Sequence, residues 1–137
     1  MNMTPSGILS KYKLNKTLCR VRILETFIKS KEALSHNDIQ KETLSVCERS
    51  TIFRIIKKFS EKGILKKIDV NNTQKYFFNS AVVFDNAEDR DLVFFHCSRC
   101  NKTIPLNDIY IPDYIIPEGY EKHYNNFVIE GLCDECG

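Results

Sequence analysis

The sequence predicts an α+β protein whose first half is basic and mainly helical and whose smaller second half consists of short strands. The charge is divided unevenly: residues 1–80 hold 16 of the 20 Lys and Arg but 7 of the 18 Asp and Glu, which gives +9. Residues 81–137 hold the other 4 basic and 11 acidic residues, which gives −7 and leaves a net charge of +2. This asymmetry indicates that the first half binds a polyanion. A solvated, Lys-rich helix surface would give the same count.

Cysteine spacing is the second observation. The chain has six cysteines. Cys19 and Cys47 stand alone, whereas Cys97 and Cys100 form one Cys-x-x-Cys pair and Cys133 and Cys136 form another. Two such pairs supply the four thiolates of a tetrahedral zinc site, which leaves no open position for a substrate. We therefore expect a structural zinc ion that pins the end of a strand pair to the chain terminus. Disulfides or a dithiol redox switch are the alternative, although cytosolic thiols stay reduced.

Two helices are predicted before residue 45. Thr17 can cap the first helix, whose apolar residues recur at helical spacing from Leu18 to Ile28. Ser35 followed by Asp38 is typical of an N-cap with an acidic first turn. We expect this second helix to be short and to end near Leu44.

The third predicted helix runs from about residue 48 to 61 and ends at Gly63. Its buried stripe is formed by four apolar side chains: Ile52, Ile55, Ile56 and Phe59. Residues 64–69 and 74–78 then form two apolar runs around an Asn-rich turn, which indicates a β-hairpin. Three short basic helices followed by a hairpin predict a winged helix-turn-helix.

The second half is expected to begin in the polar stretch 86–91, which divides the chain into domains 1–85 and 86–137. Short strands are predicted over residues 92–97, 103–106, 120–124 and 127–132. Pro105, Pro112 and Pro117 exclude a long helix between the cysteine pairs. About 50 residues provide a small core, so zinc and a dimer partner would supply the missing stability.

Several other functional classes are disfavoured. The longest apolar runs fall far short of the ~20 residues that cross a bilayer, so no membrane partner is expected. The first ten residues lack the features of a secretory signal, which favours the cytoplasm. The sequence has no nucleophile elbow, phosphate-binding Gly loop or His-Glu-x-x-His helix. We therefore expect neither an enzyme nor a small-molecule substrate.

In combination, these segments resemble the ferric uptake regulator family of bacterial metal- and peroxide-responsive repressors, over nearly the whole chain. The matching segments follow one another in the family's order: residues 17–24, 33–39, Ser50-Thr-Ile-Phe-Arg-Ile-Ile56, 61–65, Cys97-x-x-Cys100 and Gly131-Leu-Cys133-x-x-Cys136. The resemblance implies a homodimeric repressor that occupies operator DNA. Its N-terminal winged helix would bind double-stranded DNA, and a small zinc-braced α/β domain would provide dimerisation.

The resemblance also implies which side chains meet DNA. Thr51 and Phe53 would face the major groove, with Phe53 in the place of the family's tyrosine. The basic side chains nearby are candidates for phosphate or base contacts: Arg49, Arg54, Lys57 and Lys58. Two alternatives without DNA contact remain open. The basic side chains could form an exposed helix face with no ligand, and the Phe53 ring could be buried beside Ile52 and Ile56.

The regulatory metal is where the sequence departs from the family. Relatives place histidines at positions that are Leu92, Phe94 and Ala33 in this chain, and an acidic ligand at the position of Asp85. Because apolar side chains offer no lone pair, the usual sensing site cannot form. A rearranged second metal site built from Asp85, Asp91 and His96 is the alternative.

Two further functions are compatible with the sequence. A zinc-braced winged helix could act as a protein-docking module that reads no DNA sequence. A thiol redox sensor could eject zinc when its cysteine pairs oxidise. A specific footprint on a palindromic operator, or zinc release at low peroxide, would distinguish these functions from a repressor.

Overall fold

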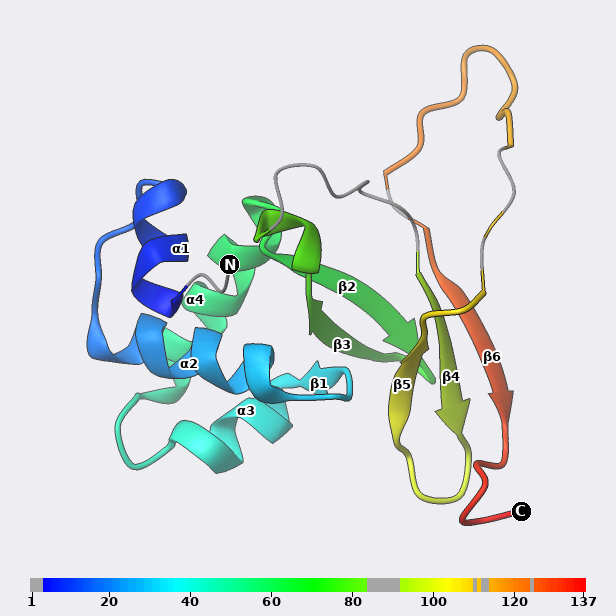
Figure 1. The fold of residues 1–137 in the computed structure, drawn as a ribbon, viewed down its shortest axis with the longest axis horizontal. Coiled ribbons are helices and arrows are strands. Elements are labelled where there is room, and N and C mark those ends of the chain that lie inside the picture. The colour runs from blue at the N-terminus through cyan, green and yellow to red at the C-terminus, as the bar shows by residue number, and fades with distance from the viewer. Residues whose placement is uncertain (1–3, 84–91, 110, 112–113, 124) are drawn as a thin grey trace. The chain divides into compact units, whose positions relative to one another are not determined.

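The computed structural model describes residues 4–83, 92–109, 111, 114–123 and 125–137. The chain divides into two compact units, Met1–Glu88 and Asp89–Gly137. The expected boundary between residues 85 and 86 lies outside the described residues. Together, the described parts of the chain contain four α-helices and two three-stranded sheets, which confirms the α+β class with an N-terminal winged helix (Figure 1).

The first unit begins with a helix that the sequence analysis did not predict, so the winged helix has one helix more than expected. Helix α1 covers Pro5–Lys11, with the Thr4 hydroxyl accepting a hydrogen bond from the Gly7 N–H and Pro5 in the first turn. The three predicted helices are confirmed as α2 (Leu18–Lys29), α3 (His36–Thr43) and α4 (Arg49–Glu61). No described helix has the length and apolar character needed to cross a membrane.

The helix ends follow the predicted capping residues. The Thr17 hydroxyl accepts a hydrogen bond from the Arg20 N–H at 3.1 Å. Ser35 and Asp38 form a reciprocal capping box at the start of α3, with bonds of 3.2 and 2.9 Å. Gly63, at φ +79°, ends α4 in a left-handed turn that is closed by the bond from the Ile64 N–H to the Phe59 carbonyl. Local sequence therefore fixes the starts of α2 and α3 and the end of α4.

A small antiparallel sheet completes the first unit. Strands β2 (Leu65–Val70) and β3 (Thr73–Phe78) form the predicted hairpin, and β1 (Leu34–Ser35) pairs with the other edge of β3. Asn71 and Asn72 both adopt positive φ, as the tight two-residue turn requires. A short 3₁₀ helix, η1 (Ser80–Val82), follows the hairpin. The hairpin of β2 and β3 forms the wing.

The core of the first unit is formed by residues from all four helices and from the wing. It contains these buried side chains: Ile8, Leu9, Ile23, Leu24, Phe27, Ile39, Cys47, Ile52, Ile55, Ile56, Phe59, Ile64, Leu65 and Tyr76. The predicted stripe of α4 is buried in full. Because this stripe occupies one side of α4, the opposite side of the helix is left for solvent or a ligand.

The described residues of the second unit form a three-stranded sheet. Its strands are β4 (Val93–Cys97), β5 (Thr103–Leu106) and β6 (Phe127–Gly131), in the order β5-β4-β6. β5 is antiparallel to β4, whereas β6 is parallel to it. The strand predicted over residues 120–124 is wrong for residues 120–123, which belong to no helix or strand, and Tyr124 lies outside the described residues. Tyr120 follows a turn at Gly119 and is largely exposed, so its β-forming side chain has no sheet face to cover.

Candidate metal centre and nucleic-acid interface

The four paired cysteines of the second unit converge at one end of its sheet. Parallel pairing places Cys97 opposite Gly131, so β4 and β6 end at the same edge and a Cys-x-x-Cys turn follows each strand there. The four Sγ atoms all lie within 4.8 Å of one another. Tetrahedral zinc with bonds of about 2.3 Å to sulfur separates its ligands by about 3.8 Å, so the cluster fits such an ion. The described residues thus provide a site that could hold a metal.

Backbone hydrogen bonds fix the two turns of the cluster. The Asn101 N–H donates to the Cys97 carbonyl at 2.9 Å, with Asn101 at φ +64°. The Cys136 N–H donates to the Cys133 carbonyl at 3.1 Å. The two turns are joined directly, because the Cys133 N–H lies 3.4 Å from the Cys97 sulfur and donates to it. The Arg99 guanidinium also donates to the Cys136 carbonyl at 3.0 Å. The ligands are therefore held together by the protein backbone itself.

Hydrogen bonds and burial shift the pKa values of three cysteines in the cluster in different directions. Backbone N–H groups of Cys100 and Cys133 lower the pKa of Cys97 to about 6, so its thiolate predominates at neutral pH. The Cys133 thiol and burial raise the pKa of Cys136 to about 12. A backbone hydrogen bond at Lys102 lowers the pKa of Cys100, but the neighbouring Cys97 side chain and burial outweigh it and raise the pKa. The site thus combines the Cys97 thiolate with the Cys100 and Cys136 thiols, which a cation would deprotonate.

Of the three residues predicted for a second metal site, His96 alone lies within the described part of the chain. His96 is 2% exposed, and its Nδ1 lies 2.8 Å from the Thr103 hydroxyl on the neighbouring strand. Asp85 and Asp91 lie outside the described residues. Among the residues that the structure describes, the paired cysteines form the one group of three or more potential ligands that is close enough to hold a metal.

Helix α4 presents the predicted DNA-contact residues on the side opposite its buried stripe. Arg49, Arg54, Lys57 and Lys58 are exposed. Thr51 is half-buried, and its hydroxyl accepts a hydrogen bond from the Arg54 guanidinium at 3.4 Å. Phe53 is 41% exposed, so the alternative that it belongs to the core is wrong. The exposed face of α4 is thus cationic with one aromatic ring in it.

His36, which the sequence analysis did not single out, contacts Phe53. The two rings stack with centroids 4.2 Å apart and an interplanar angle of 20°. Tyr76 of the wing meets the same histidine edge-on at 5.3 Å. Burial lowers the pKa of His36, which favours its neutral form. The sequence places His36 directly after the helix cap at Ser35, which indicates its position at the start of a helix. The spacing along the chain does not indicate that His36 contacts Phe53.

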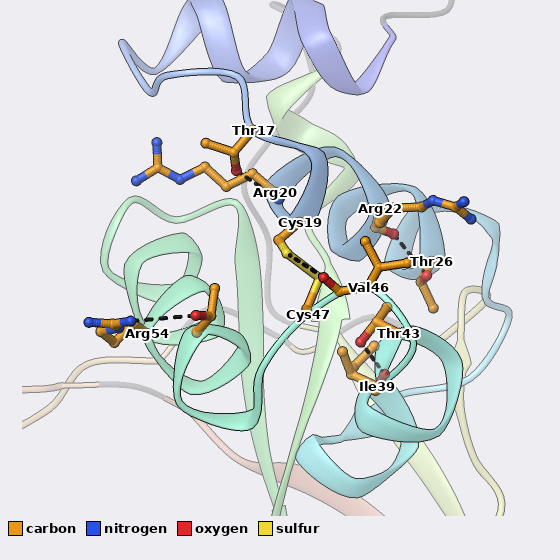
Figure 2. The surroundings of a disulfide bond; sticks show 11 residues. Thr17, Cys19, Arg20, Arg22, Thr26, Ile39, Thr43, Val46, Cys47 and Arg54 are labelled. Carbon is orange, nitrogen blue, oxygen red and sulfur yellow. Dashed lines mark hydrogen bonds between the residues drawn. A yellow bond between two sulfur atoms is a disulfide. The ribbon is translucent and has the colours of Figure 1, made fainter.

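Cys19 and Cys47 are paired in the structure, contrary to the expectation that each stands alone. They form a disulfide bond between α2 and the segment just before α4 (Figure 2). They are 28 residues apart and follow no motif, so only the packing of α2 against the helix-turn-helix reveals the pair. The remaining four cysteines are free of disulfides.

This fold and these sites define a winged-helix protein with a four-cysteine cluster that could bind metal. The family model described as the ferric uptake regulator family matches residues 11–126. Because this match covers most of the chain, the protein belongs to the ferric uptake regulator family. A search of curated protein sequences finds no match.

Solved structures with the same fold include three metal uptake regulators. A zinc uptake regulator complexed with zinc and DNA gives a TM-score of 0.66 at 16% identity, covering 95% of this chain and 88% of that one. The Francisella tularensis ferric uptake regulator with iron gives 0.61 at 21% identity, with coverages of 90% and 94%. The Helicobacter pylori ferric uptake regulator, described with three functional metal binding sites, gives 0.61 at 14% identity, with coverages of 99% and 97%. At these identities the likeness concerns the fold.

Proposed function

We propose that this chain is a homodimeric, sequence-specific DNA-binding repressor of the ferric uptake regulator type, with a structural zinc ion in each protomer. The observation that carries the proposal is the division of α4 into a buried apolar stripe and an exposed cationic face. Residues 1–85 would bind double-stranded operator DNA, and residues 86–137 would provide dimerisation. The zinc uptake regulator of the same fold is itself described in a complex with DNA.

The exposed face of α4 supplies two kinds of DNA contact. Arg49, Arg54 and Lys57 can neutralise phosphates, and the arginines can also donate two hydrogen bonds to a guanine edge. The half-exposed Phe53 ring can pack on a thymine methyl group, and Thr51 can reach a base edge or a phosphate. The guanidinium of Arg49 lies 5.8 Å from the centre of the Phe53 ring, so the cation and the ring form one surface.

The zinc ion would be held by the four clustered cysteines: Cys97, Cys100, Cys133 and Cys136. When bound, zinc supplies a crosslink among four thiolates. The ligands come from the chain at the ends of β4 and β6, where Cys97 pairs with Gly131. This site leaves no ligand position open, so the zinc would stabilise the second unit and perform no chemistry on a substrate.

Exposed apolar side chains of the second unit support dimerisation. They are Ile109, Tyr114, Ile115, Ile116, Tyr120, Ile129 and Leu132. Ile115 is 98% exposed. Large apolar side chains exposed on a unit with a small core favour burial against a second copy.

The regulatory signal is proposed to differ from that of iron- or manganese-dependent relatives. Ala33 and Phe94, at two positions where relatives carry histidine, are buried and apolar. A metal shifts operator binding only through its different affinities for two conformations, which requires ligands. A repressor acts by occupying its operator, so we propose neither catalysis nor a small-molecule substrate, and we expect the protein in the cytoplasm with its DNA.

Selection from a random duplex library, followed by fluorescence anisotropy on the selected site, tests the proposal. We expect tighter binding to the selected site than to a scrambled one, with log affinity falling by about 0.9 per neutralised phosphate for each unit of log salt. Arg54→Ala should weaken binding at least tenfold, and Phe53→Ala should relax the choice of sequence.

Lys29→Ala is the matched control, because it removes one exposed positive charge from α2 instead of α4. It should change the affinity less than threefold. Enrichment of no sequence by the zinc-loaded protein would contradict the proposal and favour a protein-docking module. Equal losses in Lys29→Ala and Arg54→Ala would show that charge alone, rather than the α4 surface, determines binding.

A further inference from the structure

The disulfide between Cys19 and Cys47 links two parts of the helix-turn-helix. Cys19 is the second residue of α2, and Cys47 lies two residues before Arg49, the first residue of α4. The two Cα atoms are 5.8 Å apart, within the ordinary range for a disulfide. Figure 2 shows the bond lying between α2 and the chain that leads into α4. The bond therefore ties α2 to the turn that positions the recognition helix.

The two sulfur atoms differ in their surroundings. Cys47 is 3% exposed and belongs to the core cluster. Cys19 is half-buried in the first turn of α2, where Thr17 caps the helix and unpaired backbone N–H groups favour an anion. An oxidant would therefore reach Cys19 first, and Cys47 would act as the resolving thiol.

The start of α4 depends on the chain around Cys47. The Val46 and Cys47 N–H groups both donate to the Thr43 carbonyl, at 3.0 and 2.9 Å. Glu48 is the N-cap of α4 but makes no side-chain capping bond. Since no side chain caps this end, the covalent link through Cys47 is an additional constraint on where α4 begins. Without the link the two sulfurs would separate to non-bonded distance, and the turn would lose this constraint.

We propose that Cys19 and Cys47 are a reversible, peroxide-responsive thiol pair whose oxidation locks α2 to the turn before α4 and strengthens DNA binding. This inference rests on the proposed function. The oxidised form would bind more tightly because a preorganised recognition helix loses less freedom when it docks. The pair is separate from the paired cysteines of the second unit, which would be engaged with zinc.

The chemistry balances with hydrogen peroxide as the oxidant. The Cys19 thiolate attacks one peroxide oxygen, the O–O bond breaks, and the departing hydroxide takes up a proton to become water. The Cys47 sulfur then attacks the Cys19 sulfenic acid, so that the S–S bond forms, the S–O bond breaks and a second water leaves with the Cys47 proton. Two thiols lose two electrons and peroxide gains them. A dithiol reductant reverses the step by thiol–disulfide exchange.

The experiment uses the full-length, zinc-loaded protein, reduced with dithiothreitol and then treated with hydrogen peroxide. Tryptic mass spectrometry should show the peptide of residues 17–20 linked to that of residues 42–49. Hydrogen exchange should slow at residues 47–52, and anisotropy should show operator affinity rising at least fivefold. A chromophoric chelator monitors zinc release, which identifies any contribution from the four-cysteine cluster.

Cys19→Ala is the matched control, because it removes the half-buried sulfur and leaves the core residue Cys47 in place. Its thermal melting should match that of the reduced wild type, which shows that it folds, and peroxide should change neither its exchange nor its affinity. Unlinked peptides, unchanged exchange at residues 47–52, or equal or weaker operator binding after oxidation would each overturn the proposal. If neither form prefers the selected site, the proposed function fails, while the linked peptides and the exchange data still decide whether the pair is redox-active and constrains α4.

Discussion

Removing the metal from the four-cysteine cluster should unfold the second unit and leave the first unit folded. Among the described residues of the second unit, the buried apolar side chains are Val93, Phe94 and Cys97. Burying a Val and a Phe contributes about 3–6 kcal/mol together, whereas capture of a structural zinc by a cysteine site contributes about 10–16 kcal/mol. The metal therefore outweighs this small core. The first unit has a cluster of 14 buried residues, and none of the four clustered cysteines belongs to it.

Hydrogen exchange measured by mass spectrometry distinguishes the two units. After chelation, or in Cys133→Ser, amides of β4 and β6 should exchange at the rate of unfolded chain, while those of α2 and α4 stay protected. Asp134→Asn, in the same turn as Cys133 but with no ligand atom in the cluster, should behave like the wild type. Continued protection of β4 in metal-free protein would refute the reasoning, because the sheet would then be stable without its crosslink.

Three further outcomes are expected. Burial lowers the pKa of His36, so the unfolded state binds a proton at this residue more readily than the folded state does. The unfolding free energy of the first unit should therefore fall as the pH drops below 6.5. In urea unfolding at pH 5 and 7, the unfolding free energy should change less with pH in His36→Gln than in the wild type. Phe59→Ala should lower the unfolding free energy by about 3–5 kcal/mol in denaturant titrations, because the ring is fully buried. Iron or manganese at micromolar levels should change operator affinity less than twofold in anisotropy assays; a tenfold change that His96→Ala abolishes would show that a second metal site has been missed.

The sequence predicted the elements whose signals are local. The Ser35 and Asp38 pair predicted the start of α3, and Gly63 predicted the end of α4, because capping depends on residues a few positions apart. The cysteine pairs also predicted their own convergence, since one metal needs four ligands at one point.

The features that were missed depend on contacts between distant residues or on weak local patterns. Helix α1 is only seven residues long and buries Ile8 and Leu9, which give no helical period. The Cys19–Cys47 bond and the stacking of His36 on Phe53 arise only when α2, α3 and α4 pack together. Tertiary packing created these contacts, and spacing along the chain could not indicate them.

Native mass spectrometry of the protein with its selected palindromic duplex tests the central claim most directly, because one mass reports chains, metal and DNA together. The account predicts a complex of two 16.0 kDa chains, two zinc ions and one duplex, which is lost when Arg54→Ala replaces the wild type under the same conditions. Retention of the duplex by the metal-free protein, or by Arg54→Ala at the wild-type level, would contradict a zinc-braced dimer that reads DNA through α4.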